Sequence, residues 1–537
     1  MTVFFSNVGA QGRDDLRLVN EQTVTINAHS HDWNTIAYDQ YKIVSYGAYQ
    51  YTGYWDKHHH LNVARRHLPT DKVETVTFPE QVSDPSNTHL NVVVGISPED
   101  GRLHLSFNHH GTDTINYRVS DAGFITSPPG SMTIDHFSDN HNIVEENRIT
   151  YPRFFNHIDD QLLLMFRQGR SGEGGQYLYQ YDAHQGTWSK VGLVFSGQGE
   201  WQGSTSRNAY LQDLIFDTSN RLHATWVYRE EAYSHSTNHG LYYAYSDDQG
   251  MTWYNNNGVR IADLSQNDPI RVDDRGIQVI DIPQNSWILN QAAMTLDSNN
   301  QPHLLMSRSK KVTNHVPDTN VHYVHYWRSA DGAWHEKYIV DTKNAVGHGP
   351  HWTEIFNYRG DIAIDEHDHI YVTLPMPNNM LYAAQSSAPR WDDWTVYALT
   401  DAGVTYAGQK YDRRRWNDEQ ILSVPMTVLG GKQTQYLIRD YIVGQSVVPR
   451  APYLKKASYE SYTVTLEWQD RAGAERYDIY RAEDGKFFSK LTTVGAEAFG
   501  QFVDTTVNDG RAYTYKLRAI NPAGESDDSN KVSVEAT

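Results

Sequence analysis

The sequence predicts an all-β protein: a seven-bladed β-propeller over residues 1–446, followed by a small β-sandwich over residues 447–537. Three observations predict this fold. A strand–turn–strand unit recurs along most of the chain, segments with helical periodicity are nearly absent, and the strand pattern changes after about residue 452. Tyrosine (36) and tryptophan (14) are abundant, as is typical of aromatic-rich β structure.

Each repeat begins with a short apolar strand, passes through an Asp/Asn/Gly turn and ends with a strand of the form "RLHLSF". The copies are "VVVGISPEDGRLHLSF" (92–107), "FFNHIDDQLLLMF" (154–166), "LIFDTSNRLHATW" (214–226), "MTLDSNNQPHLLM" (294–306) and "IAIDEHDHIYVTL" (362–374), with weaker copies at 36–46 and 415–426. A third strand such as "INYRVS" follows each copy, often with a fourth that carries Trp. Four strands per unit is the composition of a propeller blade, so seven copies predict seven blades.

The C-terminal segment has a different pattern, with "TVTLEWQD", "ERYDIYRAEDG" and "AYTYKLRAINPAGES". Alternating strands, a core tryptophan at Trp468 and a strand with Tyr513 and Tyr515 resemble a fibronectin type III sandwich. We expect an accessory module that takes no part in catalysis.

Composition and charge narrow the class of partner. The net charge is −19, so no global basic field attracts nucleic acid, and local Arg, Lys and His must bind any anionic ligand. There is no cysteine, which excludes disulfides and cysteine-ligated metals. No apolar run approaches the roughly 18 residues of a membrane span, and the N-terminal segment lacks the features of a signal peptide.

Polar residues at the strand ends of successive repeats mark the candidate site, because strand ends and loops of all blades meet on one face of a propeller. Adjacent residues of a strand point to opposite sides. We therefore expect His110 to face the site and His109 to support it or bind at its rim. The further strand-end candidates are His89, Tyr151, Arg167, Arg207, Asn208, Tyr210, Tyr228 and Arg229.

Histidine, tyrosine and arginine together fit the β-elimination of a uronic acid within a polysaccharide. Arginine binds the carboxylate through its planar fork and acidifies the C5 proton, while His or Tyr removes that proton and protonates the O4 leaving group. Glycoside hydrolysis fits less well, since it usually needs two carboxylates at a fixed separation.

The segments "HLNVVVGISPEDGRLHLSFNHHGTDTINYRVS", "YPRFF", "LLMFRQGRSGEGG" and "RNAYLQDLIFD" resemble the propeller-fold polysaccharide lyases that cut ulvan. That family is related to rhamnose–glucuronate lyases and to a propeller α-L-rhamnosidase, and the resemblance spans roughly residues 20–445. It implies a catalytic centre of His89, His110, Tyr151 and Arg167, with the acid and the base unassigned among the first three. It also implies subsite contacts from Arg207, Tyr210 and Arg229, to which the strand-end positions add His109, Asn208 and Tyr228.

The resemblance implies a sulfated, uronate-containing polysaccharide as substrate and no cofactor for the chemistry. It allows a structural divalent cation, calcium or zinc, although the absence of cysteine speaks against a zinc site with a cysteine ligand. His348 and His351 of "GHGPHW" are candidate ligands. We expect a monomer without nucleic-acid or membrane partners. It would act outside the cytoplasm (secreted, periplasmic or at the cell surface), because a polymer cannot cross a membrane intact.

Two alternatives stay open from the sequence. One is an exo-acting rhamnosyl-glucuronate lyase or α-L-rhamnosidase, and the other is a carbohydrate-binding propeller without catalytic activity.

Overall fold

The computed structural model describes residues 16–35, 40–289, 291–309, 312–313, 316–317, 321–341, 358–376, 378–401, 407–408, 410–430 and 433–537. Within these ranges β strands dominate and a single α-helix occurs, α2 (Arg413–Glu419). The 3-10 turns are η1 (Ile134–His136), η2 (His235–Thr237), η3 (Leu264–Gln266) and η5 (Ala496–Ala498). The predicted all-β class is confirmed.

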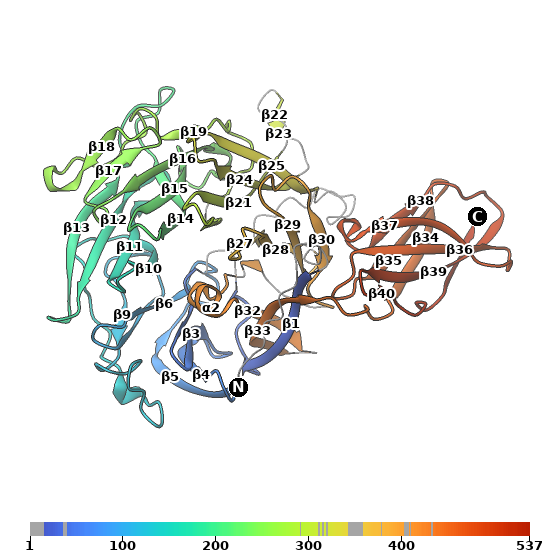
Figure 1. The fold of residues 1–537 in the computed structure, drawn as a ribbon, viewed down its shortest axis with the longest axis horizontal. Helices are drawn as coiled ribbons and strands as arrows, with labels where there is room; N and C mark the ends of the chain where they lie inside the picture. Colours follow the sequence, from blue (N-terminus) through green and yellow to red (C-terminus); the bar gives the residue numbers. More distant parts are fainter. Residues whose placement is uncertain are drawn as a thin grey trace.

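Antiparallel sheets follow one another along the chain as far as β33, and Figure 1 shows them arranged around a common centre. The first sheet holds β2 (Ile43–Tyr46), β3 (Tyr49–Trp55), β4 (His60–His67) and β5 (Lys72–Val82). The second holds β6 (Val92–Ser97), β7 (Arg102–Phe107) and β9 (Tyr117–Val119). The third holds β8 (His110–Thr112), β10 (Ile149–Asn156), β11 (Leu162–Arg170), β12 (Glu173–Asp182) and β13 (Thr187–Phe195).

The fourth sheet holds β14 (Asn208–Phe216), β15 (Leu222–Arg229), β16 (Asn238–Ser246), β17 (Thr252–Asn255) and β18 (Arg260–Asp263), with β19 (Gln278–Ile280) beside β16. The next two hold β20 (Ala293–Leu296), β21 (Pro302–Ser309), β24 (Val321–Arg328) and β25 (Trp334–Asp341), then β27 (Asp361–Ile364), β28 (Ile370–Met376), β29 (Met380–Ser386) and β30 (Thr395–Ala398). Two short pairs join β22 (Val312–Thr313) to β23 (Val316–Pro317) and β26 (Tyr358–Arg359) to β31 (Ala407–Gly408).

The N-terminal strand completes a sheet built from the far end of this region. There β1 (Leu16–Asn27) pairs antiparallel with β33 (Gln433–Gln445), which also pairs with β32 (Leu422–Gly430). Apolar side chains pack each sheet on the next, and the last on the first: Tyr54 and Ala64 of the first sheet share a core with Val24 of β1 and Ile438 of β33. The sheets therefore form a continuous ring of packing contacts.

Close packing between neighbouring sheets depends on a glycine at one position of β6. A Cβ on Gly95 would lie 2.5 Å from Cβ of Phe154 in β10, which is closer than carbon atoms can approach. The absence of a side chain lets β10 pack directly on β6 and brings their first residues, which border the candidate site, close together.

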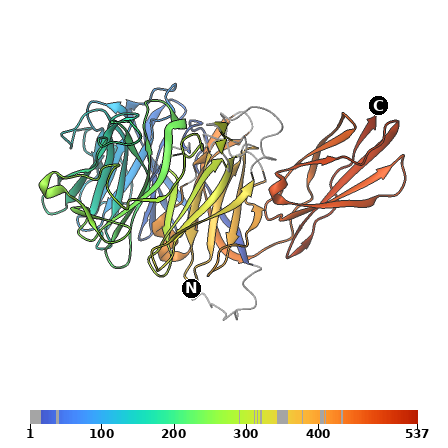
Figure 2. The same ribbon diagram turned by 90° about the horizontal axis from the view of Figure 1, so that it is seen from above.

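The C-terminal residues form two sheets around a core of their own. One holds β34 (Tyr453–Glu460), β35 (Thr463–Gln469) and β38 (Gln501–Asp504). The other holds β36 (Arg476–Glu483), β37 (Ser489–Gly495), β39 (Arg511–Asn521), β40 (Gly524–Glu525) and β41 (Val532–Ala536). Trp468, Tyr477 and Tyr515 lie in the core between these sheets, as the sequence predicts for Trp468 and Tyr515. Figure 2 shows this module at one side of the ring.

The module is docked on the ring by specific contacts. Tyr382 Oη of β29 donates a hydrogen bond to the buried Asp470 carboxylate, and Arg17 forms an ion pair with Glu475 at 2.7 Å. Phe499 packs edge-on against Tyr382, with ring centroids 5.0 Å apart, and belongs to the core of the β27–β30 sheet. The module is thus tied to the ring by packing as well as by the chain.

Candidate active site

Four predicted residues meet where neighbouring strands begin and end. His89 precedes β6, His110 begins β8, Tyr151 lies near the start of β10 and Arg167 lies near the end of β11. Since Thr150 pairs with His110 on one side and with Arg167 on the other, the sheet itself sets the last three side by side. The imidazoles of His89 and His110 are stacked, with centroids 4.1 Å apart and an interplanar angle of 11°.

Tyr151 completes this group through an irregularity in β10. Its backbone has φ +55°, and the pairing of β10 with β11 shifts between Thr150 and Arg153. Such a bulge redirects a side chain, and a tyrosine keeps a left-handed backbone only where its surroundings hold it. The Tyr151 ring lies 6.2 Å from that of His89, and Arg167 Cζ lies 5.1 Å from the same tyrosine ring.

Arg167 is held rigidly in a buried position. Its Nη1 donates to Tyr210 Oη at 2.9 Å and its Nη2 donates to Thr150 Oγ1 at 3.0 Å, while the residue is 5% exposed. Thr150 Oγ1 also accepts the Gly111 N–H at 2.9 Å, which fixes the hydroxyl. Arg167 Nε is buried and has no partner among the described residues. The guanidinium is therefore preorganised as a donor.

Tyr210 lies between two guanidinium groups. Arg229 Cζ is 4.2 Å from its ring, Arg167 Cζ is 5.6 Å away, and Arg229 Nη1 donates to Tyr210 Oη at 3.2 Å. Burial by itself raises the pKa of Tyr210, but the charges of Arg167 and Arg229 outweigh it and leave the pKa below its ordinary value. The Tyr210 hydroxyl is therefore more readily deprotonated than that of an ordinary tyrosine.

The two imidazoles are kept neutral. Burial lowers the pKa of His89 to about 3, and the nearby His110, Arg167 and Arg229 add to this effect. Burial also lowers the pKa of His110, with Arg167 as the second cause. At neutral pH both rings are therefore able to accept a proton, and the positive charge of the cluster resides on the two arginines.

Ser171 was not predicted from the sequence, although it follows directly on "FRQGR". Its hydroxyl oxygen accepts from Tyr210 Oη at 3.0 Å and from Arg229 Nη1 at 3.2 Å. It links the strand end of β11 to those of β14 and β15. A lone serine after a basic strand end carries no distinctive signal, so only the fold reveals it.

Three predicted substrate contacts are not brought to this cluster. Arg207 is fully buried; its Nε forms an ion pair with Glu230 at 2.9 Å, and its Nη1 and Nη2 donate to the carbonyls of Gly199 and Ser204. Asn208 is buried and accepts the Glu173 N–H, and Tyr228 lies in the apolar core between sheets. The Arg207 guanidinium serves the fold, whereas Asn208 Nδ2 and Tyr228 Oη are buried without a partner among the described residues. The substrate contacts expected of these three residues stay predictions.

His109 has the contacts of a supporting residue, and the substrate contact expected of it stays a prediction. Its Nε2 accepts the Asn116 N–H at 3.0 Å, its Nδ1 bonds to Thr112 Oγ1 at 2.6 Å, and the residue is fully buried. Burial lowers its pKa to about 4, in keeping with the neutral ring that these bonds require. His109 pins the hairpin that presents the exposed His110.

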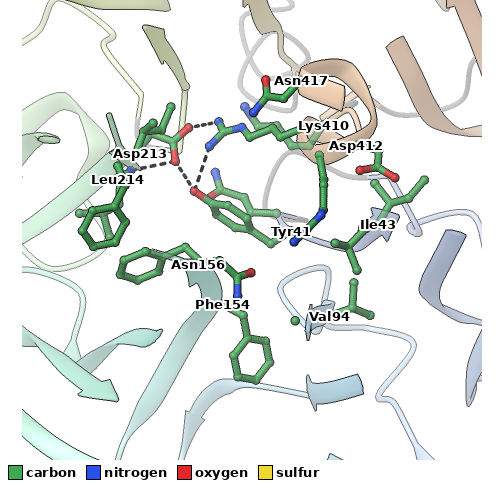
Figure 3. Close-up of a pocket in the computed structure, with 18 of the residues that line it drawn as sticks. Tyr41, Ile43, Val94, Phe154, Asn156, Asp213, Leu214, Lys410, Asp412 and Asn417 are labelled. Carbon is green, nitrogen blue, oxygen red and sulfur yellow. Dashed lines mark hydrogen bonds and ion pairs between the residues drawn. The ribbon is translucent and has the colours of Figure 1, made fainter. Parts of the chain in front are cut away.

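A cavity of about 340 Å³ lies towards the opposite ends of the same strands, lined by Asn156 and Phe216, the last residues of β10 and β14. Asp213 accepts hydrogen bonds from Tyr41 and Arg413 in this cavity, and Figure 3 shows Asp213 and Tyr41 facing each other. Arg414 is likewise paired with Asp160 at the rim. Because Asp213 pairs with Arg413 and Asp160 pairs with Arg414, the cluster around Arg167 at the other strand ends is the better candidate site for an anion.

The structural divalent cation that the resemblance allows stays a prediction. Within them no three His, Asp or Glu side chains are grouped so as to hold a metal. His348 and His351 lie outside the described residues. The same portion of the chain contains no helix long and apolar enough to cross a membrane.

The chain is similar to known proteins in sequence and in fold. A family model described as "BNR repeat-containing family member" matches residues 49–342. The "Ulvan lyase, long isoform" of Pseudoalteromonas sp. (strain PLSV) is 26% identical over 323 residues, 52% of this chain and 32% of the relative. That of Alteromonas sp. (strain LOR) is 25% identical over 392 residues, 64% of this chain and 38% of the relative. The chain thus spans about a third of the length of these relatives.

Solved structures show the same fold. The polysaccharide lyase Uly1 is 19% identical, with a TM-score of 0.61 over 79% of this chain and 99% of its own. A PL25 ulvan lyase bound to -[GlcA(1-4)Rha3S]- is 14% identical, with a TM-score of 0.57 over 79% of this chain and 96% of its own.

Proposed function

Because the chain belongs to the BNR repeat-containing family and has ulvan lyases among its homologues, we propose that it is a polysaccharide lyase that acts on ulvan. The reaction would be β-elimination at the uronic acid, which leaves an unsaturated uronyl end. One observation carries the proposal: two neutral imidazoles and two tyrosines surround a preorganised arginine in one cluster.

The proposed chemistry follows from the charge of these groups. The uronate carboxylate would bind near Arg167, whose buried Nε has no partner among the described residues, and near Arg229. A neutral imidazole or a tyrosinate would remove the C5 proton. The electron pair then forms the C4–C5 double bond, the C4–O4 bond breaks, and a protonated group supplies a proton to O4. The assignment of base and acid among His89, His110 and Tyr151 stays open.

Tyr210 has a place in this scheme beyond substrate contact. When the C5 proton leaves, negative charge spreads into the carboxylate. The two guanidiniums around Tyr210 would stabilise that negative charge. The lowered pKa of Tyr210 makes it a candidate partner for the proton transfer as well.

The finer structural predictions belong to the same proposal. We take the sheets from β2 to β33, with β1, as seven propeller blades, and the C-terminal sheets as a fibronectin type III-like module beginning near residue 447. The partner would be the anionic polysaccharide, met outside the cytoplasm by a monomer. A divalent cation, if bound, would need ligands from beyond the described residues, and metal analysis of the purified protein tests for it.

The decisive experiment mixes the protein with ulvan and follows both ultraviolet absorbance and new reducing ends. A lyase produces the absorbance of the unsaturated uronyl group together with reducing ends, whereas an α-L-rhamnosidase produces reducing ends alone. A carbohydrate-binding protein produces neither. Analysis of product size separates endo from exo action. The His110→Ala variant is the matched control, and absorbance at an unchanged rate in that variant would contradict the assigned site.

A further inference from the structure

Tyr233 is a large, exposed aromatic side chain beside the candidate site. It lies in the loop between β15 and β16, four residues after Arg229, and is 84% exposed. Its backbone has φ +59°. A left-handed conformation is unfavourable for a non-glycine residue. A bulky residue keeps it only where other contacts hold the chain.

The contact that holds Tyr233 is part of the candidate site. Its N–H donates to Ser171 Oγ at 3.2 Å, the same oxygen that accepts from Tyr210 and Arg229. The two loops also meet backbone to backbone, since a Cβ on Gly172 would lie 2.5 Å from the N of Ala232. The position of the exposed ring is therefore coupled to the reactive cluster by a single hydroxyl group.

A second aromatic pair adjoins this loop. Asn285 N donates to the Ser236 carbonyl at 2.7 Å, which joins the loop before β20 to the loop of Tyr233. On these loops the rings of His235 and Trp287 are in contact, with centroids 4.8 Å apart and an interplanar angle of 31°. The loop that carries Tyr233 is therefore joined to the loop before β20 by a hydrogen bond and a ring contact.

We propose that Tyr233 is a stacking platform for a pyranose ring of the polysaccharide, one subsite away from the uronate that reacts. An exposed phenol ring offers a flat apolar face to the C–H face of a sugar while its hydroxyl stays in water. The hydrogen bond to Ser171 places Tyr233 on the Arg229 side of the cluster. A polysaccharide whose uronate carboxylate binds at the two arginines would extend past this ring. This inference rests on the proposed function, because it assumes a polysaccharide ligand.

The test separates the ring from the backbone. Glycine adopts positive φ without cost, so Tyr233→Gly removes the ring and keeps the loop conformation, whereas Tyr233→Phe keeps the ring. Phe487→Ala is the control, since Phe487 is 99% exposed on the distant C-terminal module. Each variant is measured by steady-state kinetics on ulvan and by its retardation in gels that contain ulvan.

We expect Tyr233→Gly to raise KM about three- to tenfold with kcat nearly unchanged, and to lose retardation, since aromatic stacking contributes on that scale. Tyr233→Phe and Phe487→Ala should behave as the wild type. An unchanged KM and retardation in Tyr233→Gly would overturn the inference, as would an equal loss in Phe487→Ala or a fall in kcat alone. If the wild type makes no unsaturated product, the lyase proposal fails, but retardation that only the ring-removing variant loses would still support the platform.

Discussion

Arg167 offers the sharpest test of the proposed chemistry. The residue is 5% exposed, two nitrogens of its guanidinium donate to Tyr210 and Thr150, and its Nε is unpartnered within the described residues. Removing one preorganised donor to developing negative charge typically lowers kcat by about 10²–10³-fold. We therefore expect Arg167→Ala to lower kcat by at least about 10²-fold, with a smaller change in KM.

Arg167→Lys should recover only part of this loss. The ammonium group keeps the charge, but it cannot hold Tyr210 and Thr150 at once and still present a planar donor to the carboxylate. The ratio of the Lys variant to the Ala variant thus separates the contribution of charge from that of geometry.

The pH dependence gives a second readout of the same substitution. After burial, the Arg167 charge is one of the causes that lower the pKa of His89 and His110. A nearby positive charge opposes protonation, so its removal should raise both pKa values. The acid limb of kcat/KM should then lie at higher pH in Arg167→Ala than in the wild type, because the neutral rings are protonated earlier on acidification.

The assay is the initial rate of unsaturated uronyl absorbance over a range of ulvan concentration and pH. Arg260→Ala is the control, because Arg260 lies on the outer strand β18 with 61% of its side chain exposed. If Arg167→Ala alters only KM, Arg167 does not neutralise the transition state. Arg229 would then be examined next, since Arg207 is locked on Glu230.

The other predictions concern the acid–base residues, a buried ion pair and the C-terminal module. His89→Asn and His110→Ala should each lower kcat by at least about 10²-fold with an unchanged melting temperature; in the wild type the acid limb should lie below pH 6.5, the ordinary histidine pKa, and near-normal turnover in either variant would remove that residue from the mechanism. Arg207→Ala should lower the free energy of unfolding by about 3–5 kcal/mol in denaturant titrations, because it leaves Glu230 buried without its cation. A raised KM at full stability would instead identify Arg207 as a substrate contact. Truncation after Val448 should leave the lyase chemistry intact but lower the melting temperature, because it removes Phe499 from the core of the β27–β30 sheet. Loss of such a side chain costs about 3–5 kcal/mol. A folded but inactive truncation, or an unchanged melting temperature, would contradict this.

Local features of the sequence were sufficient for most strands and hairpins. The weak copy at 415–426 was wrong in its first half, because α2 (Arg413–Glu419) precedes β32 there. The repeat at 92–107 is β6 and β7, joined by a turn at Gly101 with φ +72°, because apolar alternation and a glycine turn act over a few residues. The same local alternation separates buried His109 from exposed His110. The positions of His89, Tyr151 and Arg167 at strand ends predicted that they lie together, because neighbouring strands bring their ends to the same edge of the fold.

The tertiary structure decided which partners each polar residue contacts. Arg207 and Arg229 look alike in sequence, each an arginine at a strand end, yet Arg207 is neutralised by Glu230, 23 residues later, while Arg229 contacts Tyr210. The pKa of Tyr210 depends on two guanidiniums from other strands, and the position of Tyr233 depends on a hydroxyl 62 residues away. The burial of a side chain and the electrostatic potential at its position depend on elements that are distant along the chain. Only the tertiary packing brings those elements together.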